Sequence, residues 1–295
     1  MNKTTLLQGI LPAVVTPMDQ DQRFVRDSYK ALLANVYAKG VHGIYVCGQT
    51  GEGLLQTVDQ RKSVAEASME FSPAGKQVIV HVGAYRTADA VELTKHSSGL
   101  GVAAVSALPP LGPYTFAEIH AYYQAIAEAS NVPLLVYFFP EICPGIKTTE
   151  QILELCAIPN VAGLKFTDFD LFRMRRLKQS GAVLFNGRDE ILAAGLMMGA
   201  DGGIGSFYNI VPEMFVELYG CSLRNEWIAA RDVQDRINNI IQITLKYPLF
   251  PALKQILKWM GIDCGPCVQP RQGLTADQSR KLRQQLEGSG IAFRE

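Results

Sequence analysis

The chain has 295 residues, and 28 basic side chains balance 28 acidic ones, so the formal net charge is zero. Without a basic block, the sequence lacks the electrostatic footprint of a nucleic-acid-binding protein. No apolar stretch reaches the roughly 18 residues that a membrane-spanning helix needs, and the first eight residues lack the apolar core of a signal peptide. We therefore expect a soluble cytoplasmic protein that binds neither nucleic acid nor membranes.

Short apolar runs alternate with helical patterns along the whole chain. The predicted strands cover residues 10–16, 43–47, 78–82, 103–108, 133–137, 161–165, 183–186 and 202–205. The predicted helices that follow them cover residues 27–38, 57–71, 87–98, 115–129, 148–156, 168–179 and 189–198, with a last set that begins near 211. Eight strand–helix units in regular order predict an α/β protein with a (β/α)8 TIM barrel. The alternative is an open doubly wound sheet, but residues 16–18 read Thr-Pro-Met where that fold usually has a glycine-rich phosphate turn.

Three more helical patterns, at residues 226–245, 250–260 and 275–285, exceed what a closed barrel needs. We therefore predict a barrel over residues 1–222 and a C-terminal helical extension over residues 223–295. The active site of such a barrel is expected at the carboxyl ends of its strands.

The six cysteines are scattered, and a cytosolic chain keeps its thiols reduced, so the sequence predicts no disulfide framework. Residues 264–267, Cys-Gly-Pro-Cys, match the thioredoxin tetrapeptide, which requires a strand before it and a helix that starts at its first cysteine. Here a helical pattern precedes it and Pro270 follows closely, so redox chemistry is not expected. The cysteine pair alone is half a zinc site and the four histidines fall on separate elements, so no metal is predicted.

Lys165 ends an apolar run that reads as a buried parallel strand. Burial lowers the pKa of a lysine, and a neutral amine is a nucleophile towards carbonyls. Tyr137 ends the preceding apolar strand, about one β-α-β repeat earlier, so amine and phenol would face one mouth. The pair suggests Schiff-base chemistry with a proton carrier; the alternative is a lysine that snorkels at a strand end.

Two glycine-rich segments provide further candidate site residues. Residues 48–53 include Gln49 and Thr50, and their backbone N–H groups could converge on a carboxylate, although such turns are common in βα loops. Ser206 follows the glycine-rich eighth strand and offers a hydroxyl.

Polar residues also follow the sixth and seventh strands. Thr167 comes directly after the strand of Lys165. Asp189 and Glu190, preceded by Gly187, could accept hydrogen bonds from sugar hydroxyls. The alternative is structural, a helix N-cap with an acid in the first turn. For Arg188, between Gly187 and Asp189, we expect a solvent-facing side chain; the alternative is contact with an anionic group of the substrate.

Four short sequence motifs, taken together, are specific for one protein family, although no single one is. They are Gly48-x-Thr50-Gly51-Glu52, Tyr137-x-x-Pro140, Gly163-x-Lys165 and Gly203-x-Gly205-Ser206. Over nearly its whole length the chain resembles the pyruvate-dependent class I aldolases of the N-acetylneuraminate lyase and dihydrodipicolinate synthase superfamily. The resemblance implies a (β/α)8 barrel with C-terminal helices, usually a homotetramer. It also implies a covalent Schiff base between Lys165 and a 2-oxo acid, with no separate cofactor.

Within that superfamily the chain is most similar to the members that cleave sugar acids. The resemblance implies cleavage of N-acetylneuraminate, or a similar 2-oxo sugar acid, to pyruvate and N-acetylmannosamine. It assigns catalysis to Lys165 and Tyr137, and substrate binding to Gln49, Thr50, Thr167, Gly187, Asp189, Glu190 and Ser206. Ile142 stands where dihydrodipicolinate synthases carry an arginine for a second carboxylate, which argues against that activity.

Two positions depart from the family pattern. Gln49 replaces a serine or threonine, although an amide still donates a hydrogen bond. Leu111 and Gly112 stand where many members have a tyrosine pair, and Tyr114 is displaced from it. The departure at Leu111 leaves open a related Schiff-base dehydratase or aldolase for 2-keto-3-deoxy sugar acids. A dihydrodipicolinate-synthase-like enzyme and a non-catalytic sugar-acid-binding protein are further alternatives.

Overall fold

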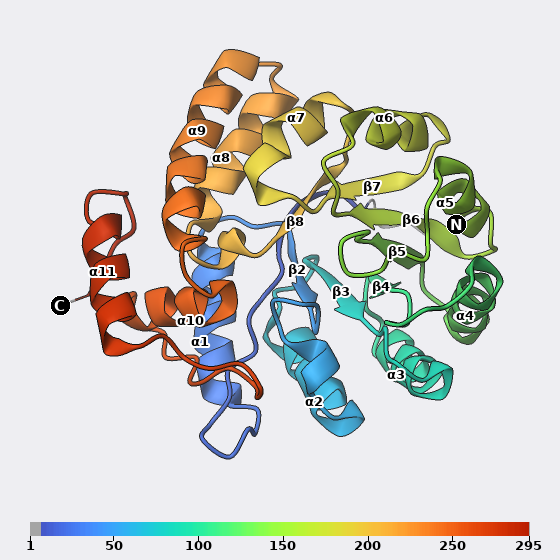
Figure 1. The fold of residues 1–295 in the computed structure, drawn as a ribbon, viewed down its shortest axis with the longest axis horizontal. Helices are drawn as coiled ribbons and strands as arrows, with labels where there is room; N and C mark the ends of the chain where they lie inside the picture. The colour runs from blue at the N-terminus through green and yellow to red at the C-terminus, as the bar shows by residue number, and fades with distance from the viewer. Residues whose placement is uncertain (1–6, 295) are drawn as a thin grey trace.

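The computed structural model describes residues 7–294, and parallel strands ringed by helices form its centre (Figure 1). In the sheet the strands follow the order β1-β8-β7-β6-β5-β4-β3-β2. A parallel bridge between Ala13 and Tyr45 joins the two ends and closes the barrel. The strands are β1 (Gly9–Pro12), β2 (Gly43–Val46), β3 (Gln77–His81), β4 (Ala104–Ala107), β5 (Leu134–Phe138), β6 (Val161–Phe166), β7 (Val183–Asn186) and β8 (Gly202–Gly205). The predicted TIM barrel is confirmed.

A helix follows each strand and covers the outside of the barrel (Figure 1). Several begin where the sequence supplies a cap: at Thr57, Thr115 and Thr148 the hydroxyl accepts from the backbone N–H three residues on, in a capping box. These helices are α1 (Arg26–Ala38), α2 (Val58–Phe71), α3 (Thr87–Gly99), α4 (Phe116–Ala129), α5 (Thr149–Cys156), α6 (Leu171–Gln179), α7 (Leu192–Met197) and α8 (Pro212–Leu223).

Three C-terminal helices gather on one side of the barrel, α9 (Trp227–Thr244), α10 (Leu249–Trp259) and α11 (Ala276–Leu286) (Figure 1). They match the three predicted helical patterns, and α9 packs along α8. The chain therefore has a barrel with a helical extension. The division into units at residue 222 stays a prediction.

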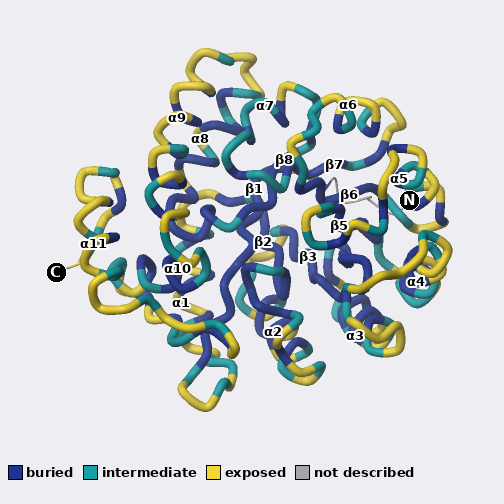
Figure 2. The backbone as a smooth tube through the Cα atoms, in the orientation of Figure 1, coloured by how far each residue is buried: buried dark blue, intermediate teal, exposed yellow. Residues whose placement is uncertain are grey.

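Burial follows the sequence pattern. The strands are buried, while the outward faces of the helices and most loop tips are exposed (Figure 2). Within residues 7–294, no helix has the length and apolar character that crossing a membrane would require.

The clearest difference from the prediction lies at residues 189–198. Instead of one helix, a 3-10 turn η2 (Asp189–Ile191) precedes α7. The side chain of Gln234, on α9, accepts from Ala193 N at 2.9 Å and donates to the Asp189 carbonyl at 3.0 Å. These two contacts replace the helical hydrogen bond that would have joined residues 189 and 193. A long-range contact with the extension therefore shapes the loop after β7.

Candidate active site

Lys165 and Tyr137 are paired in register on the neighbouring strands β6 and β5. Both are buried at the carboxyl ends of their strands. The Lys165 Nζ atom lies 4.1 Å from the centre of the Tyr137 ring and 4.4 Å from that of the Tyr45 ring. The strand positions read from the sequence thus bring amine and phenol side by side.

Burial controls the protonation of both groups. It lowers the pKa of Lys165 to about 7, and the nearby Asp189 carboxylate opposes that shift. A large fraction of the amine is therefore neutral near pH 7 and able to attack a carbonyl. Burial also raises the pKa of Tyr137 above its ordinary value, so the side chain remains a phenol at neutral pH.

One cavity of about 210 Å³ lies above this pair. All predicted site residues line it: Gln49, Thr50, Tyr137, Lys165, Thr167, Gly187, Asp189, Glu190 and Ser206. They come from the loops or strand ends of β2, β5, β6, β7 and β8. The structure thus brings the whole predicted set together at the carboxyl end of the barrel, while the role of each residue remains a prediction.

The glycine-rich loop after β2 is held from two sides. The Thr50 Oγ1 and Ser206 Oγ atoms are 2.7 Å apart, which joins it to the loop after β8. Glu52 has a buried carboxylate whose Oε1 lies 2.9 Å from Lys254 Nζ on α10, and its Oε2 accepts from Val268 N at 2.9 Å. The C-terminal extension thereby fixes the loop that carries Thr50.

Asp189 is not the N-cap of α7, so that part of the structural alternative is wrong, although Asp189 and Glu190 do stand in the first turn of η2. Its Oδ2 atom accepts from Phe207 N at 2.9 Å in the loop after β8, and the N-cap of α7 has no side-chain bond. Its buried Oδ1 atom has no hydrogen-bond partner, and burial raises the pKa of the carboxyl to about 7. A Cβ at Gly205 would lie 1.7 Å from that oxygen, so only glycine fits there.

The expectation that Arg188 faces solvent is wrong. Its side chain is only 15% exposed and lines the cavity, because Phe169 and Phe139 cover it and Glu141 pairs with it. Its Cζ atom lies 4.3 Å from the centre of the Phe169 ring and 5.3 Å from that of Phe139. Phe139 and Phe169 lie in loops, where neither the helical nor the strand repeat of hydrophobic residues predicts which way a side chain points.

Sequence reasoning also missed the wall that the C-terminal helices contribute. Apolar side chains from α9, α10 and the turn between them line the cavity: Ile241, Leu245, Leu249 and Phe250. On the sequence they belong to ordinary amphipathic helix patterns, which give no signal of a binding site.

The segment that departs from the family pattern contributes no tyrosine to the cavity. Tyr114 is 38% exposed and is not among the lining residues. Leu111 and Ile142 pack instead against a second apolar cluster that includes Tyr137. The described residues of this segment therefore place no tyrosine in the cavity of their own chain at the position of the family's tyrosine pair.

The remaining candidates behave as structural groups. Cys264 and Cys267 are buried outside any helix, and burial raises the pKa of each thiol to about 12. His81 is buried, with Nδ1 3.1 Å from the Cys47 carbonyl and Nε2 accepting from Leu108 N. Among residues 7–294, no group of three or more His, Cys, Asp or Glu has the arrangement of a metal site.

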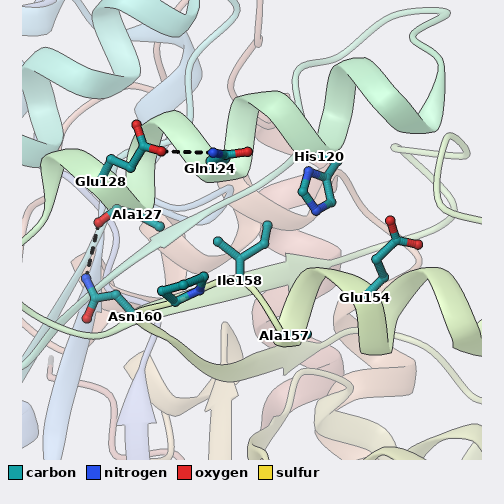
Figure 3. A pocket seen from close by; sticks show the side chains of 9 residues that line it. His120, Gln124, Ala127, Glu128, Glu154, Ala157, Ile158 and Asn160 are labelled. Atoms are coloured by element: carbon teal, nitrogen blue, oxygen red, sulfur yellow. Dashed lines mark hydrogen bonds between the residues drawn. The ribbon is translucent and has the colours of Figure 1, made fainter.

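A larger hollow, of about 450 Å³, lies between α4 and α5 (Figure 3). His120 and Glu154 line it from the two helices, and Ile158, just after α5, lines it as well. Asn160, at its edge, immediately precedes β6, whereas Lys165 is near the other end of that strand. This hollow is therefore at the opposite end of the barrel from the candidate active site.

A buried lysine beside a tyrosine, at the mouth of a (β/α)8 barrel, is the arrangement expected of a Schiff-base aldolase. The dihydrodipicolinate synthetase family model matches residues 6–289, so the chain belongs to that family. It is a class I aldolase by that membership.

Named relatives agree with this assignment. The chain is 34% identical to the N-acetylneuraminate lyase of Rhizobium meliloti, over 98% of this chain and 97% of that protein. It is 36% identical to N-acetylneuraminate lyase 2 of Escherichia coli, over 89% and 88% of the two chains. The wild-type sialic acid aldolase of Ruminococcus gnavus has a similar structure, with a TM-score of 0.91, 29% identity and 96% of each chain covered.

Proposed function

We propose that this enzyme cleaves N-acetylneuraminate, or a closely similar 2-oxo sugar acid, reversibly to pyruvate and N-acetylmannosamine. The observation that carries the proposal is the buried amine of Lys165, 4.1 Å from the Tyr137 ring, at the floor of a cavity rich in polar groups. The names of the similar proteins support the same substrate class.

The first step is Schiff-base formation. The neutral Lys165 amine attacks the C2 ketone, and loss of water from the resulting carbinolamine gives an iminium. Thr50, Gln49 and the backbone N–H groups of their loop hold the substrate carboxylate, which places the ketone over the amine. The ties of this loop to Ser206 and Lys254 keep it in position without substrate.

The second step breaks the C3–C4 bond. The iminium takes up the bonding electron pair and becomes an enamine, while the C4 hydroxyl loses its proton and becomes the aldehyde. Tyr137 carries that proton, because its phenol faces the same cavity as Lys165, and the substrate carboxylate assists. Protonation of the enamine at C3 and hydrolysis then release pyruvate and restore the amine.

The sugar chain lies against the loops after β6, β7 and β8. Thr167, Asp189, Glu190 and Ser206 offer oxygen atoms to its hydroxyls, and Gly187 lets the chain approach closely. The Asp189 Oδ1 and Thr167 Oγ1 atoms are buried without a hydrogen-bond partner, so substrate hydroxyls would satisfy them.

Product analysis tests the proposal. Incubation with N-acetylneuraminate should release pyruvate and N-acetylmannosamine in equal amounts, and the reverse mixture should form the sugar acid. If folded enzyme releases neither product, N-acetylneuraminate is not the substrate. We also propose a homotetramer, from the resemblance alone. Light scattering on the active fractions measures the mass of the active species and tests it.

A Schiff-base dehydratase or aldolase for 2-keto-3-deoxy sugar acids is the second candidate. Gln49 lines the cavity where the family has a hydroxyl, and Tyr114 lies outside it, so the proton route differs from that of many relatives. Loss of water from such an acid, without release of an aldehyde, would favour this candidate over the first.

A further inference from the structure

We propose that Arg188 selects substrates that carry a second anionic group, a phosphate, sulfate or carboxylate, at the end of the sugar chain far from the ketone. This inference rests on the proposed function and refines its substrate class. Family membership does not assign Arg188, and the sequence leaves contact with an anionic substrate group as the alternative to a solvent-facing side chain.

The guanidinium has the surroundings of an anion-binding group. Only 15% of the Arg188 side chain is exposed, yet it lines the cavity together with Lys165 and Tyr137. The rings of Phe139 and Phe169 lie against it at 5.3 and 4.3 Å from its Cζ atom. Its Nε–H is buried and has no hydrogen-bond partner. A planar fork with a free donor matches a phosphate or carboxylate in two-point contact.

The backbone of the loop that carries this guanidinium is held in place by hydrogen bonds before a ligand arrives. The Arg188 carbonyl accepts from Asn186 Nδ2 at 2.6 Å. Gln234 and Asn238, on α9, donate to the carbonyls of the two following residues, Asp189 and Glu190. Little ordering of the loop is therefore needed when an anion binds.

Glu141 is the present partner of Arg188, and it can be exchanged. Its side chain is 58% exposed, in the loop after β5, so the Glu141 carboxylate stays in contact with water while it pairs with Arg188. A substrate anion that enters from the cavity side can take its place at small cost, since the Glu141 carboxylate returns to water. The pair thus keeps the arginine oriented in the free enzyme.

The position of Arg188 along the barrel indicates which end of the substrate it meets. Lys165 is in register with Phe185 of β7, and Arg188 lies three residues beyond it, about 10 Å of extended chain further towards the mouth. Asp189 and Glu190 follow it and line the same cavity, so an anion elsewhere on the sugar would meet carboxylates. Selection therefore depends on the place of the charge as well as on its sign.

The test compares matched acceptors in the condensation direction, with pyruvate saturating. The pairs are N-acetylmannosamine against N-acetylmannosamine 6-phosphate, and mannose against mannuronic acid. We expect kcat/KM to be about 10- to 100-fold higher for the anionic member, the worth of a charge-assisted hydrogen bond, with most of the difference in KM. Arg188→Gln should bring the ratio close to one, and Arg188→Lys should give an intermediate ratio.

Two further variants sharpen the result. Glu141→Gln removes the competing carboxylate and should increase the preference for the anionic acceptor. Arg280→Gln removes an equally charged but exposed side chain on α11 and should leave the ratio as it was. A wild-type ratio near or below one, or an Arg188→Gln variant that keeps the ratio, would overturn the inference. Failure of the proposed function itself looks different, because neither the neutral nor the anionic member of either pair would then condense with pyruvate.

Discussion

The floor and the rim of the cavity differ in how they are built. On the floor, Lys165 and Tyr137 stand on paired strands, and neighbouring strand positions alone determine where they lie. On the rim, Gln234 on α9 and Lys254 on α10 hold the loops after β7 and β2 from the far end of the chain. The barrel strands therefore position the amine and the phenol, whereas the shape of the cavity above them depends on the extension.

The largest expected effect is at the floor. Among residues 7–294, Lys165 is the only lysine that lines the cavity, so Lys165→Ala should lower turnover by about 10³-fold or more. Steady-state release of pyruvate measures this. Lys254→Met is the contrast, because Lys254 is the other buried lysine of the described chain and pairs with Glu52. Near-wild-type turnover of the Lys165→Ala variant would remove Lys165 from the mechanism.

The next effect concerns the proton carrier. Tyr137→Phe keeps the ring beside the amine but deletes the phenol, so kcat should fall by about 10²–10⁴ while the adduct with pyruvate still forms. Comparing single-turnover cleavage with adduct formation separates the two steps. A decrease of less than tenfold in kcat would assign the proton transfer to another group.

At the rim, Lys254→Met tests stability. It leaves the buried Glu52 carboxylate without its closest cation, and we expect a loss of about 3 kcal/mol in the free energy of unfolding. Denaturant titration measures it. Lys281→Met, which breaks an exposed pair with Asp277 on α11, is the control and should cost well under about 1 kcal/mol. Equal effects of the two variants would contradict a structural role of the buried pair.

Gln234→Leu tests whether the extension shapes the loop after β7. Loss of both hydrogen bonds frees Ala193 N and the Asp189 carbonyl, and we expect KM for the sugar acid to rise about tenfold, the cost of about one such bond. Gln242→Leu, on the exposed face of the same helix, is the matched control. A KM unchanged in both variants would show that α9 does not set the rim.

The smallest effect is a shift in pH dependence. Because the attacking form of Lys165 is the neutral amine and burial lowers its pKa to about 7, adduct formation should rise with pH through about 7 and then level off. The Asp189 carboxylate favours the ammonium, so Asp189→Asn should move the midpoint to lower pH. Trapping rates measured between pH 5 and 9 check this (a range around that pKa); a midpoint moved upwards would contradict the assigned electrostatics.

The floor could be predicted from the sequence because strand order and period determine it. The ends of β5 and β6 follow from apolar runs, and the parallel barrel places their last side chains at one mouth. The rim could not be predicted in the same way. Its contacts join residues that are far apart along the chain or lie in irregular loops. They are the hydrogen bonds of Gln234 to the loop after β7, the ion pair of Glu52 with Lys254, and the aromatic rings over Arg188.

Arg188 shows the limit most clearly. The loop pattern predicts Asp189 and Glu190 as cavity residues, which is where they lie, but it favours a solvent-facing side chain for the arginine directly before them. Its actual place depends on Phe139 and Phe169, which lie in the loops after β5 and β6. Neither loop has a period from which side-chain direction follows.

The central claim is that Lys165 forms a Schiff base, and borohydride trapping tests it most directly. The enzyme is incubated with pyruvate, reduced and digested, and its peptides are mapped by mass. The account predicts one reduced pyruvyl adduct, on Lys165, with none on Lys254, whose amine donates to the Pro266 carbonyl at 2.7 Å. Folded enzyme that carries no adduct on Lys165 would contradict it.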